Sequence, residues 1–125
     1  MKAVFCEIAG KKYPLVYSAG AISRMTSLFG GYENIQKYMT NIDGMIEHIC
    51  EVAAAMIDQG CKYMNLTGEE KPENAAVDED GRWVPLTVQE IEVFATDVGE
   101  LAKAIGEAFA QQSTVQVKTK ESKNA

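Results

Sequence analysis

Residues 42–59 read IDGMIEHICEVAAAMIDQ and form the clearest periodic run in the chain. Apolar side chains recur along it at steps of three and four residues, at Ile42, Met45, Ile46, Ile49, Cys50, Ala53, Met56 and Ile57. This spacing places them on one broad face of an α-helix, with the acidic side chains turned away from it. The run therefore predicts a core helix that ends at Gly60. A further turn over 61–66 would point Tyr63, Met64 and Leu66 inward.

A β-hairpin precedes this helix. Residues 2–9 and 12–17 each alternate weakly between apolar and polar side chains, and Gly10-Lys11 is a plausible turn because glycine tolerates a positive φ. Pro14 lacks the N–H that a central strand needs, so its strand is expected at a sheet edge. A lone hairpin is marginal in water and must pack on the helices that follow.

Local end signals divide the rest of the chain. Ser18 is a good N-cap, Gly30-Gly31 ends the first helix, and Thr40 or Asn41 caps the helix after 32–39. Residues 67–82 are acidic and rich in turn formers, which predicts a loop or mobile linker. Thr87 and Glu90 match a capping box, opening a helix with inward-facing Ile91, Phe94, Val98, Leu101, Ala102, Ile105 and Phe109. Thr96 or Asp97 is placed to restart that helix.

These elements predict a mainly α (α+β) fold, with an N-terminal β-hairpin packed on a bundle of about four to five helices. Residues 1–112 are expected to form one domain that includes the acidic loop 67–82, and residues 113–125 a polar, disordered, flexible tail. The length of 125 residues suits a single domain with its own core.

Composition limits the function. The net charge is −6 and the sequence pI is near 4.8, which disfavours nucleic acid and anionic membranes as partners. No apolar run is long enough to span a membrane, and the N-terminus does not resemble a signal peptide. The odd cysteine count, without CxxC, favours small buried hydrophobes in a reducing cytosol.

Catalytic, cofactor and metal motifs are not found in the sequence. His48 is expected on an exposed helix face, because no partner residues for catalysis or metal binding stand at suitable spacing. Asp78–Gly81 resembles part of a calcium loop, but Ala76 and Thr87 then occupy positions that require carboxylates. We therefore expect neither an enzyme nor a cofactor-binding protein.

The methionines and the single tryptophan each allow two interpretations. The methionines at 25, 39, 45, 56 and 64 fit adaptable core packing, or else a deformable groove for a partner helix. Trp83 fits a core anchor for the last helix, or else an exposed interface anchor.

Several short motifs recur in a recognisable order. They are IAGKKYPL at 8–15, SAGAI at 18–22, LFGG at 28–31, then a long apolar helix, Gln59-Gly60, and Pro85-Leu86-Thr87 before the last helix. This order resembles the small tail-assembly chaperones of long-tailed bacteriophages and prophages, over most of residues 2–110. Each motif is weak alone, and the order carries the resemblance.

The resemblance implies a non-enzymatic protein in the cytoplasm of an infected or lysogenic bacterium. Such chaperones bind the tape-measure protein, keep it soluble, promote assembly of the tail tube around it, and are usually absent from the virion. The tail-tube protein and a frameshifted longer form of the chain are further partners that it implies. The alternative is a minor structural tail or connector protein that is retained in the virion.

The family supplies no ligand motif, so the site prediction rests on aromatic residues expected to be exposed near the hairpin and the loop. We select Tyr13, Tyr17, Tyr32 and Trp83 as partner-binding residues. The oligomeric state stays open between a monomer and self-association through a wide apolar stripe.

Overall fold

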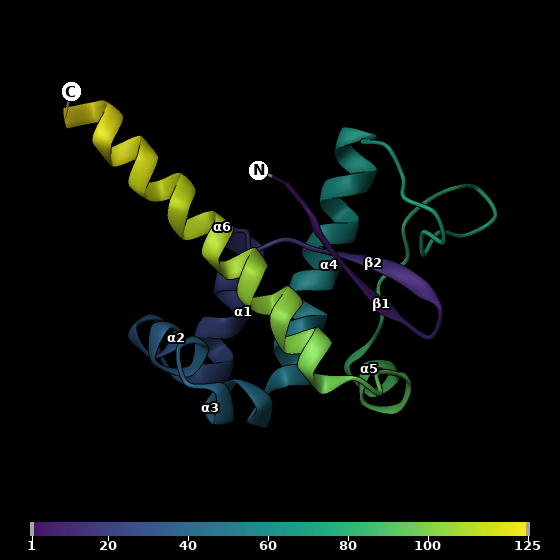
Figure 1. Cartoon of the computed structure of the whole chain (residues 1–125), viewed down its shortest axis with the longest axis horizontal. Helices are drawn as coiled ribbons and strands as arrows, with labels where there is room; N and C mark the ends of the chain where they lie inside the picture. Colours follow the sequence, from purple (N-terminus) through teal and green to yellow (C-terminus); the bar gives the residue numbers. More distant parts are fainter. Residues whose placement is uncertain (1, 125) are drawn as a thin grey trace.

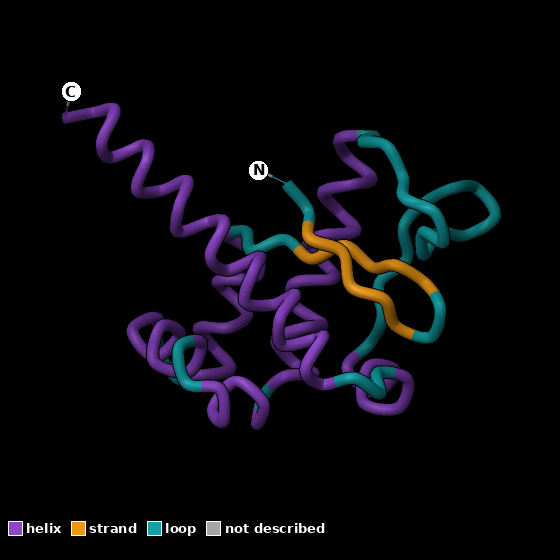
Figure 2. The backbone as a smooth tube through the Cα atoms, viewed as in Figure 1, coloured by secondary structure: helices purple, strands orange, loops and turns teal. Residues whose placement is uncertain are grey.

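A computed structural model describes the backbone of residues 2–124 and the side chains of residues 2–111. The elements follow one another as β1 (Val4–Ile8), β2 (Lys11–Leu15), α1 (Ala19–Phe29), α2 (Tyr32–Met39), α3 (Ile42–Glu47), α4 (Ile49–Thr67), α5 (Val88–Phe94) and α6 (Val98–Asn124). Helices dominate, and the two antiparallel strands form the only sheet in the described residues (Figures 1 and 2). The predicted mainly α fold with an N-terminal hairpin is confirmed.

Helix α4 is the centre of the fold. It packs against β2, α1, α5 and α6, and α6 also contacts both strands. In Figure 1 the hairpin crosses α4 while α6 runs diagonally past it. The core lies between these elements and includes the fully buried side chains of Leu15, Met25, Met56, Ile57 and Ile105. The hairpin thus packs on the helices. It needs this support because a hairpin on its own is only marginally stable in water.

The predicted helix over 42–59 is two helices, because the chain breaks at His48. This residue leaves the helical conformation with φ −117° and ψ 20°. Its ring stands edge-on to the stacked pair of Phe29 and Tyr38, with centroid distances of 5.3 Å and 5.6 Å. Aromatic packing therefore accompanies the break in the helical ladder, a tertiary effect that the periodicity does not contain.

Gly60 does not end α4, and the further turn that the sequence allowed over 61–66 is formed instead. The helix continues to Thr67 and ends at Gly68, which has the left-handed conformation with φ 67°. Gly60 instead lies where α4 passes β2, and a Cβ there would overlap the carbonyl group of Pro14. Glycine is needed at this position because the two backbones come into direct contact.

The hairpin turn lies one residue earlier than predicted. Ala9 and Gly10 both have positive φ, 52° and 80°, and Ile8 pairs with Lys11 to close the turn. Two central residues with positive φ are typical of a type I′ turn, whose twist matches that of the strands. Pro14 stands opposite Phe5 in β2. Both strands of a two-stranded sheet are edge strands, so the predicted edge position of Pro14 is confirmed.

The segment 67–82 is a loop, but the hairpin anchors part of it. The Lys12 N–H donates to the Asn74 carbonyl (2.7 Å), and the Ala76 N–H donates to the Lys12 carbonyl (3.0 Å). The Asp78 side chain accepts from the N–H groups of Asp80 (2.9 Å) and Arg82 (3.0 Å), which makes a tight turn of the acidic stretch. The segment is therefore not a free linker throughout.

The capping box before α5 is confirmed. Thr87 Oγ1 accepts from the Glu90 N–H (3.1 Å), and Glu90 Oε1 accepts from the Thr87 N–H (2.9 Å). The helix stops after Phe94, and Asp97 restarts it as α6 by accepting from the Glu100 N–H (3.0 Å). Asp97 was one of the two predicted restart positions.

Helix α6 continues to Asn124, whereas the sequence predicts a polar, flexible tail over 113–125. The side chains from residue 112 onward lie outside the described residues. The flexibility of this tail therefore stays a prediction.

Candidate partner-binding surfaces

Three of the four predicted partner-binding aromatics are buried. Tyr13 and Tyr17 are each 8% exposed and Trp83 is 4% exposed, whereas Tyr32 is 65% exposed. Tyr17 packs edge-on against Phe109 with a centroid distance of 5.1 Å. The expected exposure is therefore wrong for Tyr13, Tyr17 and Trp83, because β2, the segment after it and the loop before α5 each turn their aromatic side chain into the core. Only Tyr32 presents its ring to a partner in this conformation.

Trp83 is a buried core residue and not an exposed interface anchor, but its hydrogen bonds and ring contact join it to α4 and β1 instead of the last helix that it was predicted to anchor. The Asn65 side chain holds its backbone at both ends, accepting from the Trp83 N–H (2.9 Å) and donating to the Trp83 carbonyl (3.2 Å). Its ring lies 6.0 Å from that of Phe5. Among the described residues, the buried indole N–H has no hydrogen-bond partner. Trp83 thus fastens the loop to α4 and the hairpin.

The five methionines at 25, 39, 45, 56 and 64 are all buried. They belong to one core cluster with the hairpin and helices. Core packing is therefore their role, and among them Met25 also lines a shallow surface hollow between α1 and α4.

His48 is half-buried, contrary to the expected exposed position. Besides its contacts with the Phe29 and Tyr38 rings, its Nδ1 lies 3.7 Å from Glu51 Oε2. Among the described residues, no group of three or more His, Cys, Asp or Glu side chains is arranged to hold a metal ion. The contacts of His48 explain its position as packing at the junction of α3 and α4.

The cysteines behave as small apolar side chains. Cys6 and Cys61 are buried, Cys50 is half-buried, and all three are free thiols. Burial raises the pKa of Cys61 to about 12. Burial, together with Glu100, Asp97 and Glu7, raises the pKa of Cys6 to about 11. The thiolate form, which is the nucleophile and metal ligand, is therefore disfavoured at both buried sites.

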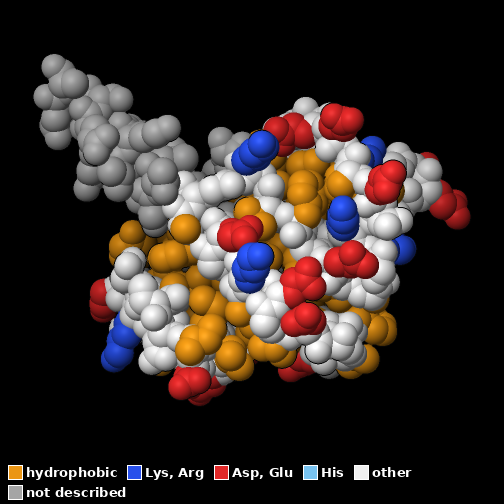
Figure 3. Space-filling model, in the orientation of Figure 1, with side chains coloured by type: hydrophobic (Ala, Val, Ile, Leu, Met, Phe, Trp, Pro, Cys, Tyr) orange, Lys and Arg blue, Asp and Glu red, His pale blue; other side chains and the backbone are white. Residues whose placement is uncertain are grey.

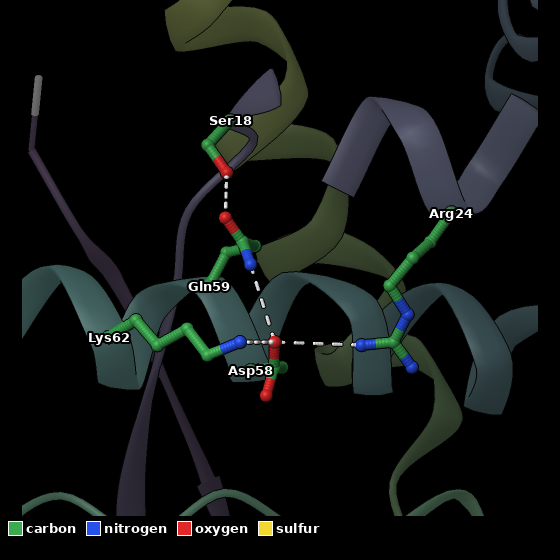
Figure 4. Close-up of polar contacts among 5 residues, drawn as sticks. All are labelled: Ser18, Arg24, Asp58, Gln59 and Lys62. Atoms are coloured by element: carbon green, nitrogen blue, oxygen red, sulfur yellow. Dashed lines mark hydrogen bonds and ion pairs between the residues drawn. The ribbon is translucent and has the colours of Figure 1, made fainter. Parts of the chain in front are cut away.

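A polar network joins α1 to α4 (Figure 4). Asp58 Oδ2 lies 3.1 Å from Lys62 Nζ and 3.7 Å from Arg24 Nη1, and it accepts from Gln59 Nε2 (3.3 Å). The Ser18 hydroxyl donates to Gln59 Oε1 (2.6 Å). Ser18 occupies the predicted N-cap position, but its side chain binds α4 instead of capping α1. The network fixes the start of α1 on α4.

Two shallow hollows flank this network, with volumes of about 330 Å³ and 320 Å³. Arg24 and Val88 line both of them, so the hollows adjoin between α1, α4 and the start of α5. Their walls combine apolar side chains with Glu51 or Asp58. Their chemistry is that of a surface groove.

Five large apolar side chains remain exposed on neighbouring helices. They define the helical apolar surface, made of Ile42, Ile46, Val93, Phe94 and Val98. Each is between 42% and 71% exposed. Helix α3 packs on α6, and α5 packs on α4 directly before α6. Figure 3 shows hydrophobic side chains gathered along the lower edge, over the region of α3 and again over that of α5.

This surface was missed in the sequence because the predicted stripes placed four of its five residues, all but Val93, inward. The break at His48 turns Ile42 and Ile46 out of the stripe continued by α4. The break between α5 and α6 does the same for Phe94 and Val98. Leu66 is also exposed, at the far end of α4, contrary to its predicted inward position.

Comparisons of the chain with protein-family models, curated proteins and solved structures find no match. Within the described residues, none of the helices combines the length and apolarity needed to cross a membrane. A functional proposal for the chain must therefore be argued from its sequence motifs and its surfaces.

Proposed function

We propose that the protein is a phage tail-assembly chaperone that binds the tape-measure protein, keeps it soluble and promotes tail-tube assembly without catalysing a reaction. Two observations support the proposal. One is the ordered resemblance of the motifs between residues 8 and 87 to that family. The other, which carries the physical argument, is the helical apolar surface.

The chemistry of this surface suits a helical client with exposed apolar side chains. Scattered exposed apolar residues are ordinary, but here five lie on α3, α5 and the first turn of α6, where α3 contacts α6 and α5 contacts α4, and such a set supports an interaction site. Covering them yields about 1 kcal/mol for each half-exposed side chain. Such a gain, reduced by the cost of association, favours a complex that forms and releases.

Acidic residues border the apolar ones. Asp43 and Glu47 flank Ile42 and Ile46 on α3, and Glu92 adjoins Val93 on α5. Together with the net charge of −6, these carboxylates keep a coated client charged on its outer side. This arrangement supports a solubilising role, because coated clients repel one another.

The proposal includes a location and a lifetime. The chaperone acts in the cytoplasm of the infected or lysogenic bacterium and leaves before the particle is complete. A frameshifted longer product and the tail-tube protein are the further partners. The second candidate, a minor tail or connector protein, shares the phage setting but stays in the particle, and mass spectrometry of purified virions separates the two.

Co-expression with the tape-measure protein from the same gene cluster tests the proposal. The wild-type chain should raise the soluble fraction of that protein several-fold. A variant with Ile46→Glu and Val93→Glu should lose this effect, because it places charges within the helical apolar surface.

Leu66→Glu is the matched control, since Leu66 is 86% exposed and lies at the opposite end of α4 from α3 (Figure 1). It should retain the effect. Circular dichroism and thermal unfolding establish that each variant is folded. An unchanged soluble fraction with the wild-type chain rejects the proposed function.

A further inference from the structure

Strand β1 has an edge that no described residue pairs with. The turn at Ala9 and Gly10 makes Ile8 and Lys11 a hydrogen-bonded pair, so bonded pairs recur at Cys6 and Val4. Phe5 and Glu7 therefore direct their main-chain N–H and C=O groups away from β2. The one contact found there is a long one of 3.9 Å, from the Cys6 thiol to the Glu7 carbonyl.

The outer edge of β2 is already covered. Residues 74–76 pair with it in the parallel direction through the two hydrogen bonds of Lys12. This covering shows within the chain itself that an extended segment can lie along the hairpin. The edge of β1 is its uncovered counterpart.

A hollow of about 530 Å³ opens beside β1. Its lining runs along the chain from Cys6 to Gly10, and the opposite wall is the link between α5 and α6, from Phe94 to Asp97, with Glu100 and Leu101. Three strand residues and the two turn residues form one wall, so the hollow lies beside the second half of β1 and the turn, directly after Phe5. The space lies between two walls of the protein and is not closed by the described side chains.

The charge of this hollow has one sign. Glu7, Asp97 and Glu100 line it, and no lysine or arginine does. Phe94 and Ile8 add apolar surface. A segment that fits must therefore offer main-chain hydrogen bonds, basic side chains for the carboxylates and apolar side chains for the floor.

We propose that the edge of β1 binds an extended segment of a partner protein, in which lysine or arginine alternates with apolar residues, by adding it as a third strand to the hairpin. The main chain of the segment pairs with Phe5 and Glu7. Its basic side chains neutralise Glu7, Asp97 and Glu100. This interaction goes beyond the chaperone function. It uses main-chain groups of β1, whereas the helical apolar surface consists of side chains, of which Phe94 also lines the hollow. Its test does not involve the tape-measure protein.

A second copy of the chain is the less suitable occupant. Pairing two β1 edges would bring two sets of the same three carboxylates together, and like charges across an interface oppose binding. Charged side chains on short edge strands are a known means of preventing such pairing. A basic segment turns the same charges into an attraction.

The test uses the full-length protein and the eight-residue peptide KVKVKVKV, followed by fluorescence anisotropy and amide hydrogen exchange. We expect saturable binding, with slower exchange of the Phe5 and Glu7 amides. The peptide N-methylated at every residue keeps the side chains and charges but cannot pair, and it should bind at least tenfold more weakly. The peptide EVEVEVEV should not bind.

Protein variants separate the hollow from general charge attraction. Glu7→Lys combined with Glu100→Lys should weaken binding at least tenfold, whereas Glu70→Lys with Glu79→Lys, in the loop, changes the net charge equally and should not. Lack of saturable binding, equal binding of the N-methylated peptide, or equal effects of the two variants would overturn the proposal. Protection of Phe5 and Glu7 by self-association without peptide would also overturn it.

Discussion

Gly60 lies against the main-chain carbonyl of Pro14, and this contact joins the central helix to the hairpin. A Cβ at Gly60 would overlap both the carbonyl oxygen and carbon of Pro14. Leu15 and Met56, which lie next to this crossing, are fully buried. The two backbones are thus in direct contact at the point where β2 packs on α4.

Gly60→Ala should destabilise the protein by about 2 kcal/mol or more, because the overlap is with backbone and cannot be relieved by turning a side chain. Gly106→Ala is the matched control, since Gly106 is also helical and has nothing within 4 Å of an added Cβ. It should stabilise the protein by about 0.5–1 kcal/mol. Urea unfolding of both variants gives the free energies, and equal effects would contradict this account of the crossing.

Trp83→Phe should change the free energy of unfolding by less than about 1 kcal/mol. The substitution loses packing but also removes a buried N–H that has no partner in the described structure. Trp83→Ala should cost about 3–5 kcal/mol, because it removes the anchor between the loop, α4 and Phe5. Thermal and urea unfolding distinguish the pair. A large loss with phenylalanine would mean that the indole N–H is paired in solution.

Thr87→Ala should cost about 1 kcal/mol, since it removes the side-chain half of the capping box of α5. Thr67→Ala is a suitable comparison, because the Thr67 hydroxyl bonds to the Tyr63 carbonyl at the exposed end of α4 and caps no N-terminus. Its cost should stay below about 0.5 kcal/mol. A smaller loss for Thr87 than for Thr67 would refute the capping role.

Alkylation should distinguish the three thiols in the folded protein. At pH 8, iodoacetamide should label half-buried Cys50 first and leave Cys6 and Cys61 largely unmodified until the protein unfolds. Mass spectrometry of digested samples gives the three rates. Rapid labelling of Cys61 in the native state would contradict its burial.

The same thiols give a pH dependence of stability with a defined sign. Their folded pKa values, about 11 for Cys6 and about 12 for Cys61, lie above the ordinary value of 9.0. The folded state thus holds the proton more tightly, so this contribution is fully present below pH 9 and is lost as the pH rises from 9 towards 12. The free energy of unfolding should therefore be lower at pH 10.5 than at pH 8. The difference between the two pH values should be smaller in the variant Cys61→Ala.

Local chemistry predicted the parts of the fold that depend on few residues. Gly30 ends α1 in a left-handed conformation, Asn41 caps α3, and Thr87 with Glu90 caps α5, all as their residue types indicate. The hairpin followed from alternation, and its turn was displaced by one residue because Ala9 also takes a positive φ.

Tertiary contacts decided the rest, and the sequence pattern does not contain them. Gly60 reads as a helix end until the carbonyl of Pro14 is seen to occupy the place of its Cβ. His48 reads as an exposed helical residue until its ring meets Phe29 and Tyr38. The candidate site depended on these breaks, so the aromatic residues chosen from sequence were mostly buried and the helical apolar surface was missed.

Hydrogen exchange on the complex with the tape-measure protein tests the central claim most directly. The account predicts a complex in which residues 42–47 and 88–98 exchange more slowly than in the free chain, because a client helix covers the helical apolar surface. The end of α4 around Leu66 should be unchanged. Failure to form a complex, or protection confined to the end of α4, would contradict the account.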